Sequence, residues 1–260
     1  LAQENRNMFH GQIVAITGSN GKTTTKEISY LLLSFLTDKK SVFKSPKNWN
    51  NELGLSLSLL GLNRKHKIGI FEIGTNRPGE IYSLSNFLKP DYGAITNIGR
   101  SHLEKLKNLD GVAKEKSDLF INVKNKGVCL DRIDNKYRKL ISKKAIGKEL
   151  KLLGNETKDI FDLNFEVAYL IVKEVLNLER NSNVELSELK KRIQDNLKIP
   201  GRMEKINGPK KTTILNDSYN ANPDSFLAAF EFISKLKYKH KILAGSYTHL
   251  RAHETINHLV

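Results

Sequence analysis

A glycine-rich segment between an apolar run and a helical pattern could bind phosphate. It reads Thr17-Gly18-Ser19-Asn20-Gly21-Lys22-Thr23-Thr24. Glycines let backbone N–H groups close around phosphate oxygens, and the N-terminus of the following helix adds partial positive charge. Lys22 can then reach the β- and γ-phosphates of a nucleotide, and the Thr23 hydroxyl can ligate magnesium. We therefore expect residues 17–24 to form a nucleotide-phosphate loop.

The spacing of the glycines is shorter than in the common phosphate-loop pattern. Only Ser19 and Asn20 separate Gly18 from Gly21. A glycine-rich turn that binds no ligand is the alternative. The Gly-Lys-Thr sequence between a strand and a helix makes that alternative the weaker interpretation.

Two more side chains with possible chemistry stand where expected strands end. Glu72 closes an apolar run, and ligands of parallel sheets bind at the carboxyl ends of strands. A carboxylate there could hold Mg²⁺ beside phosphate, although Glu72 could equally be a helix cap or a surface acid. His102 follows another expected strand and is a candidate neighbour of metal or phosphate, but a single histidine is more often structural. By residue type alone, Lys116 is an ordinary solvated lysine of a helix.

The pattern around these residues alternates between strands and helices. Apolar runs predict strands at 12–17, 67–73, 92–97, 127–130, 212–216 and 239–244. Helical spacing predicts helices at 22–35, 78–88 (with proline in its first turn), 111–122, 161–178, 187–197 and 223–236. Such alternation is typical of an α/β fold whose mostly parallel sheet is covered by helices on both faces.

A break at Ile199-Pro200-Gly201 predicts a domain boundary, after which a new β-α-β pattern begins. We expect a first domain over 1–199 and the start of a second, Rossmann-like α/β domain over 200–245. The tail 246–260 resembles translated sequencing-adapter DNA, so we expect it to be an artefact; a genuine polar tail is the alternative. Because the chain starts at Leu1, we also expect native sequence to be missing there.

Composition excludes several protein classes. The 260 residues are 39% hydrophobic and 27% charged, which argues against disorder. No apolar run is long enough for a membrane span, and a lone Cys129 excludes a disulfide framework and a cysteine zinc site. The net charge of +15 allows a nucleic-acid-binding NTPase as an alternative. However, the basic residues form no long block and no aromatic stripe accompanies them, so we expect no nucleic-acid partner.

From Gly11 to Ala244, the order and wording of the motifs resemble the Mur ligase family, ATP-dependent amide-forming enzymes of peptidoglycan synthesis. The resemblance rests on the phosphate loop and on 48–54 (Asn-Trp-Asn-Asn-Glu-Leu-Gly), 72–80, 201–204 (Gly-Arg-Met-Glu) and 216–225. It is closest to members that join D-alanyl-D-alanine to UDP-N-acetylmuramoyl-tripeptide. Another Mur ligase or a folylpolyglutamate-type ligase is the alternative, but these usually carry histidine in the stretch that here reads Asp217-Ser218-Tyr219-Asn220.

The resemblance implies a role for each matching residue, with ATP and two Mg²⁺ ions as cofactors. Lys22, Glu72, His102 and Lys116 would be catalytic. Thr23, Glu72, His102 and Lys116 would hold metal, and Lys116 would be carbamylated, which overturns its interpretation as a solvated lysine. Asn164 would lie near adenine, Arg202 and Asp217 near the nucleotide phosphates and ribose, and Asn50, Asn51 and Asn220 near the peptide substrates.

The resemblance further implies a monomeric, cytoplasmic enzyme. Two positions depart from the family pattern, which commonly has proline where Ser56 stands and leucine where Trp49 stands. Neither removes a chemical group that the mechanism needs. By the same comparison, we expect the N-terminal domain that holds the UDP-sugar to be absent and the C-terminal domain to stop soon after its second strand.

Overall fold

The computed structural model describes residues 1–130, 135–147, 149–153, 159–178 and 185–244. The chain divides into two compact units, Leu1–Leu197 and Lys198–Val260, which are described separately. The tail that we expect to be an artefact lies outside the described residues. None of the helices in the described ranges combines the length and apolarity that crossing a membrane requires.

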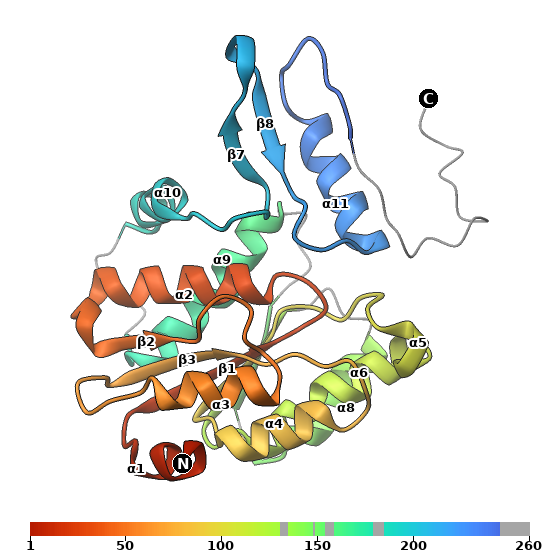
Figure 1. Cartoon of the computed structure of the whole chain (residues 1–260). Coiled ribbons are helices and arrows are strands. Elements are labelled where there is room, and N and C mark those ends of the chain that lie inside the picture. The colour runs from red at the N-terminus through yellow and green to blue at the C-terminus, as the bar shows by residue number, and fades with distance from the viewer. Residues whose placement is uncertain (131–134, 148, 154–158, 179–184, 245–260) are drawn as a thin grey trace. The chain divides into compact units, whose positions relative to one another are not determined.

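The first unit is built on a parallel sheet, as the alternating pattern predicts (Figure 1). Its strand order is β2-β3-β1-β4-β5-β6, and every neighbouring pair is parallel. The strands are β1 (Gln12–Thr17), β2 (Val42–Lys44), β3 (Ile68–Glu72), β4 (Tyr92–Ile95), β5 (Lys126–Leu130) and β6 (Glu149–Leu153). β1 is central because its apolar residues are enclosed on both faces, as is usual in parallel sheets.

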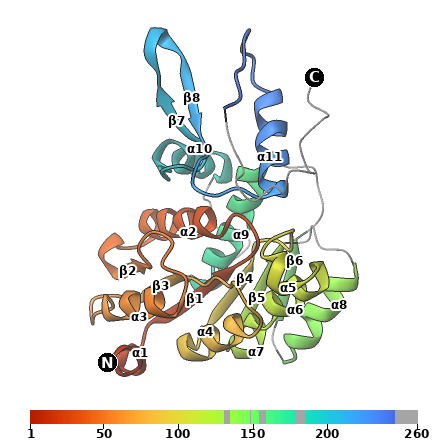
Figure 2. The same ribbon diagram turned by 45° about the vertical axis from the view of Figure 1, so that its right-hand side comes forward.

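Helices cover both faces of this sheet (Figures 1 and 2). The helices of the first unit are α1 (Ala2–Met8), α2 (Lys22–Leu36), α3 (Glu52–Leu60), α4 (Glu80–Leu88), α5 (Leu103–Leu106), α6 (Leu109–Ser117), α7 (Leu119–Asn122), α8 (Asn135–Lys144), α9 (Ile160–Val175) and α10 (Leu186–Asn196). A short 3₁₀ turn, η1 (Lys39–Ser41), precedes β2.

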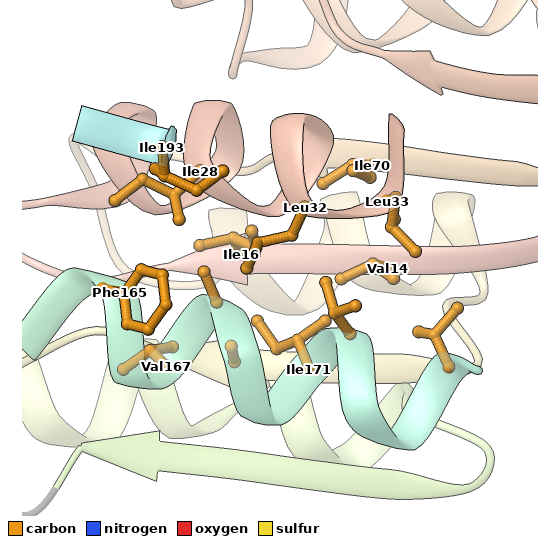
Figure 3. Packing of buried hydrophobic residues seen from close by; sticks show 14 of the residues in the cluster. Val14, Ile16, Ile28, Leu32, Leu33, Ile70, Phe165, Val167, Ile171 and Ile193 are labelled. Carbon is orange, nitrogen blue, oxygen red and sulfur yellow. The ribbon is translucent and has the colours of Figure 1, made fainter. Parts of the chain in front are cut away.

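Alternate residues of β1 serve two separate cores. Val14 and Ile16 pack with α2, α9 and α10 in one apolar cluster (Figure 3). Ile13 and Ala15 pack with α3, α4, α7 and α8 in the other. This is the period-two alternation of a strand covered on both sides, and it fixes the position of the loop that follows Thr17.

The arrangement of α2 and α4 creates a switch point at the carboxyl ends of β1 and β3. These strands are neighbours, with Ile16 opposite Glu72. The chain leaves β1 into α2 on one face and leaves β3 toward α4 on the other. Ligands of open parallel sheets bind where adjacent connections diverge in this way. The phosphate loop and Glu72 both lie at this edge.

The second unit contains an antiparallel hairpin and a helix. β7 (Glu204–Asn207) pairs with β8 (Thr213–Asn216) around the 3₁₀ turn η2 (Pro209–Lys211), and α11 (Pro223–Ser234) follows. The expected strand at 239–244 is wrong: these residues have no regular secondary structure. A strand needs a pairing partner, and Ile242 is 93% exposed.

Several elements of the first unit were not expected from the sequence. β2, α5, α8 and β6 are too short or too polar to give a clear periodic signal, and the apolar residues of α3 are not confined to one face. The helix expected over 111–122 is two helices that meet at Asp118. Pro78 precedes α4 rather than lying in its first turn, since Gly79 is the N-cap.

Candidate active site

The loop between β1 and α2 has the backbone geometry of an open helix N-terminus. Gly21 caps α2 in a left-handed conformation (φ +79°), and no side chain caps the first turn. A helix N-terminus whose N-cap residue has no side chain favours a bound anion. Gly18 has φ +150°, and a Cβ atom there would lie 1.8 Å from Thr96 Oγ1. Glycine is needed at position 21 because of its positive φ, and at position 18 because of its positive φ and its close packing against Thr96.

The segment after β4 holds this loop in place. Ser19 N donates to Asn97 O (3.1 Å), and Asn20 N donates to Asn97 Oδ1 (2.8 Å). Thr96 Oγ1 donates to Asn20 O. Ser101 Oγ donates to Ser19 Oγ (2.9 Å), where both hydroxyls are buried. The loop is therefore fixed to the chain segment that leads to His102.

The functional side chains of the loop differ in their surroundings. Lys22 Nζ donates to Gly18 O (2.9 Å) and Ser19 O (3.3 Å), so the ammonium lies over the loop. Thr24 is half-buried. Thr17 is fully buried, and its Oγ1 has no hydrogen-bond partner among the described residues. A buried polar atom without a partner at a loop of this kind is what a ligand-binding site leaves unsatisfied.

Glu72 joins three segments of the chain. Thr23 Oγ1 donates to Glu72 Oε2 (2.8 Å), and Asn50 Nδ2 donates to Glu72 Oε1 (2.8 Å). Glu72 is only 1% exposed. Asn50 is fixed in turn, because its carbonyl accepts from Gly74 N (2.8 Å). Asn51 instead caps α3 by accepting from Gly54 N (2.8 Å).

Lys116 is not the solvated lysine that its residue type indicates. It is 1% exposed, and the structure shows no hydrogen bond from its Nζ to any described residue. Burial and the charge of Lys22 place the pKa of Lys116 well below its ordinary value, against the opposing effect of Glu115. The sequence could not show this because Lys116 follows two charged residues, Lys114 and Glu115, and α6 has a weak apolar stripe.

His102 lies within the electrostatic influence of the same lysines. Burial lowers the pKa of His102, and the positive charges of Lys116 and Lys22 lower it further, while Glu80 opposes them. The backbone of His102 is left-handed (φ 55°), which is uncommon for residues other than glycine. The fold therefore holds a histidine with a lowered pKa beside the phosphate loop.

Asn164, a residue of α9, contacts the end of the phosphate loop. It is buried in α9, and its Oδ1 accepts from Thr25 Oγ1 (3.2 Å). A Cβ atom on Gly21 would lie 2.3 Å from the same Oδ1. The side chain of Asn164 therefore packs directly against the start of α2.

Sequence reasoning missed two buried charged residues beside the site. Lys26, one turn after Thr23, is fully buried and donates to Ser45 O (2.8 Å) and Lys47 O. Glu115 is 3% exposed and accepts from two backbone N–H groups of another element. Lys26 follows the Gly-Lys-Thr sequence by three residues, a helical spacing that could have placed it on the same face as Thr23.

The remaining predicted residues belong to the second unit. The Arg202 guanidinium lies 4.2 Å from the centroid of the Tyr219 ring. Asp217 Oδ1 accepts from Met203 N (3.1 Å), and burial raises the pKa of Asp217. Asn220 is exposed, and its Oδ1 accepts from Ala221 N (2.9 Å). These contacts order the turn regions around β7 and β8.

In the described ranges, no three side chains of the His, Cys, Asp and Glu types gather as a metal centre would require. Of the four residues expected to bind metal, Thr23 and Glu72 are joined by a hydrogen bond beside the phosphate loop. Such a pair suits Mg²⁺ better than a caged metal, because Mg²⁺ commonly keeps water and phosphate oxygens among its ligands.

Comparisons with known proteins agree on the family. The family model described as "Mur ligase middle domain" matches residues 16–207 of this chain. UDP-N-acetylmuramoyl-tripeptide–D-alanyl-D-alanine ligase of Borreliella burgdorferi is 32% identical, covering 91% of this chain and 56% of that protein. The ligase of the same name from Buchnera aphidicola (subspecies Baizongia pistaciae) is 28% identical, covering 98% and 61%.

Solved structures show the same fold. The crystal structure of MurF ligase from Thermotoga maritima in complex with ADP has a TM-score of 0.73 and 28% identity, covering 88% of this chain and 58% of that one. A MurF structure from Acinetobacter baumannii has a TM-score of 0.78 at 24% identity. The chain thus spans less than two thirds of the length of these relatives.

Proposed function

Because this chain belongs to the Mur ligase family, we propose that it is part of an ATP-dependent ligase that joins D-alanyl-D-alanine to UDP-N-acetylmuramoyl-tripeptide. The observation that carries the proposal is the hydrogen-bonded chain Thr23–Glu72–Asn50, which links the phosphate loop to a segment outside it. A nucleotide phosphate bound at the loop and a group bound near Asn50 would share Glu72. This is what transfer between two substrates requires.

The proposed reaction has two steps. The terminal carboxylate of the tripeptide attacks the γ-phosphorus of ATP; a new P–O bond forms, the bond to the β-phosphate oxygen breaks, and ADP leaves. The amine of D-alanyl-D-alanine then attacks the acyl phosphate, loses a proton, and expels inorganic phosphate as the amide forms. Lys22 and the N-terminus of α2 would stabilise charge on the transferred phosphoryl group.

The donor set around Glu72 fits Mg²⁺. A hydroxyl and a buried carboxylate in contact are oxygen ligands of the kind that Mg²⁺ takes. Thr23 would ligate the ion beside the phosphates, and Glu72 and His102, with Lys116, would help bind the second. When bound, Mg²⁺ would neutralise phosphate charge during the transfer.

We extend the proposal to carbamylation of Lys116. Its burial and lowered pKa favour the neutral amine, whose nitrogen can attack the carbon of CO₂. An N–C bond forms, one C=O π bond opens to an oxyanion, and the amine loses a proton. The carbamate would give Lys116 two oxygens that share one negative charge, as the carboxylate of an aspartate or glutamate does. Its negative charge would also offset the positive charge of Lys22.

The second unit and the rest of the first supply the remaining roles. Asn164 packs against Gly21 and is proposed to lie near adenine. Arg202 and Asp217 are proposed to contact the phosphates and ribose, and Asn51 and Asn220 to lie near the peptide substrates. ATP and UDP-linked precursors as substrates also support a cytoplasmic location.

The test is a substrate panel on the full-length ligase of which this chain is proposed to be part, with ADP release as the readout. We expect release to depend on the UDP-linked tripeptide and amide product to require D-alanyl-D-alanine. Stimulation by glutamate with a folate, or by another amino acid, would instead indicate a different ligase of this fold. Stimulation by DNA or RNA with a steep salt dependence would indicate a nucleic-acid-dependent NTPase. The Lys22→Ala variant is the control for release at the phosphate loop.

A further inference from the structure

Glu115 is a buried carboxylate that points away from its own helix. It is 3% exposed and lies in α6 directly before Lys116. Its Oε2 accepts from Gly79 N (2.6 Å), and its Oε1 accepts from Ile81 N (2.8 Å). Both donors belong to the start of α4, so each oxygen of the carboxylate contacts a segment 34 to 36 residues earlier in the chain.

The two donors explain why the charge is tolerated at this depth. The first N–H groups of a helix have no partner within the helix, and the helix dipole favours a negative charge beside them. α4 is nine residues long and has no side-chain cap from its own N-cap residue, Gly79. Glu115 therefore provides from α6 the cap that α4 lacks.

This contact joins α6, which carries Lys116, to the segment that follows Glu72 in the chain. The start of α4 continues the loop that leaves β3 after Glu72. Hydrogen bonds to Glu80 hold the same loop: its Oε2 accepts from Asn76 N (2.6 Å) and Arg77 N (3.0 Å). A helix of α6's length is marginal by itself, so its orientation depends on such contacts.

Neighbouring side chains of a helix are separated by a fixed rotation of about 100° around its axis. Fixing Glu115 on α4 therefore also fixes the direction in which Lys116 leaves α6. We propose that Glu115 is a positioning residue that holds Lys116 at the site through its bidentate contact with the start of α4. The role of a positioned Lys116 rests on the proposed function, whereas the contact between Glu115 and the start of α4 does not.

A second anchor of α6 offers a matched control. Lys144 of α8 pairs with Asp118 and donates to Lys114 O (2.8 Å), and both charged side chains of the pair are less than a fifth exposed. This anchor also holds α6. Its charged partner, Asp118, lies beyond Lys116 at the C-terminal end of the helix, and Asp118→Asn changes that partner alone. An effect of general loosening would appear in both variants, whereas an effect on the position of Lys116 should appear only when Glu115 is changed.

The first experiment measures the accessibility of Lys116 by amine labelling with acetic anhydride in CO₂-free buffer, read out by peptide mass spectrometry. We expect Glu115→Ala to label Lys116 about tenfold faster than wild type, as when local opening loses a hydrogen bond to a charged group. Asp118→Asn should leave its labelling within about twofold, since partly exposed ion pairs contribute little. Glu115→Gln, which retains one acceptor oxygen, should restore most of the protection.

The second experiment is kinetic and uses the same variants in the ligase reaction. We expect Glu115→Ala to lower kcat about 10- to 100-fold while the KM for ATP stays within about twofold, because the phosphate loop is untouched. Equal labelling of Lys116 in Glu115→Ala and Asp118→Asn would overturn the proposal, as would a change in KM alone. If wild type shows no ligase turnover, the proposed function fails, and the labelling result still decides the role of Glu115.

Discussion

Two lysines in the described part of the chain are almost completely buried, and they differ in what surrounds them. Lys26 in α2 donates to the carbonyls of Ser45 and Lys47, and Glu27 lies beside it. Lys116 in α6 has no such acceptor among the described residues, and the carboxylate of Glu115 is bonded to backbone amides instead. Burial lowers the pKa of both.

The comparison shows that burial alone does not distinguish a structural cation from a reactive amine. A buried ammonium is stable when carbonyl oxygens replace the lost water. Without them the neutral amine is favoured, and a neutral amine is a nucleophile. The predictions below change one lysine environment at a time.

The largest expected effect is on catalysis at Lys116. The Lys116→Ala variant should form acyl phosphate about 10²- to 10³-fold more slowly, the usual cost of removing one group that stabilises a transition state. A short carboxylic acid such as acetate should restore part of the rate, because it can occupy the vacated space as an anion. Wild type in the same acetate buffer is the control. An unchanged rate in the variant would eliminate the assignment.

The largest expected effect on stability is at Lys26. Lys26→Met removes the donor from the buried carbonyl of Ser45 and from the carbonyl of Lys47, so the free energy of unfolding should fall by about 2–4 kcal/mol. Urea denaturation followed by circular dichroism measures it. Lys44→Met is the matched control: Lys44 pairs with Glu27 but is 33% exposed, so its loss should cost about 1 kcal/mol or less. Equal losses in the two variants would contradict the structural role of Lys26.

A third prediction uses pH to compare Lys116 with an apolar replacement. The pKa of Lys116 in the folded state lies well below 10.5, so between these values the unfolded chain binds a proton that the folded chain does not. The unfolding free energy of wild type should therefore rise, relative to that of Lys116→Met, as pH increases through this window. Lys22, Glu115 and His102 are the charged or titratable groups that act on Lys116.

This comparison is made by urea unfolding at several pH values from about 7 to 10 in CO₂-free buffer. At neutral pH the Lys116→Met variant should be as stable as wild type or more stable by about 1–3 kcal/mol, since it removes a buried polar group without a partner. A difference that does not change with pH would show that Lys116 titrates alike in the folded and unfolded chains.

The smallest expected effect is at Thr23, which donates to Glu72. Thr23→Val keeps the shape but removes the hydrogen bond to Glu72, so Mg-ADP affinity should fall about tenfold while stability changes by about 1 kcal/mol. Trp49 is the single tryptophan and precedes Asn50, so its fluorescence can report binding. Thr37→Val, at the opposite end of α2 where the hydroxyl donates to Leu33 O (2.7 Å), should bind as wild type does. A similar loss in both variants would argue against a specific role for Thr23.

Much of the sheet could be predicted because its strands have local signals. β1, β3, β4 and β5 fall where apolar runs indicate them, as does β8 of the hairpin, and β1 to α2 is predicted almost to the residue. β2 and β6 were missed because their formation depends on neighbouring strands. The expected strand at 239–244 shows the converse: an apolar run forms no strand where no described strand pairs with it.

The sequence by itself determined the strand-loop-helix around Lys22 and the positions of Glu72 and His102 after strands, because backbone preferences and apolar spacing act over a few residues. Only the tertiary structure decided which side chains meet. The contacts of Asn50 with Glu72, of Asn164 with Gly21 and of Glu115 with α4 join segments far apart in the chain. The burial of Lys116 follows from the packing of α6 against the rest of the first unit, and no local pattern contains that information.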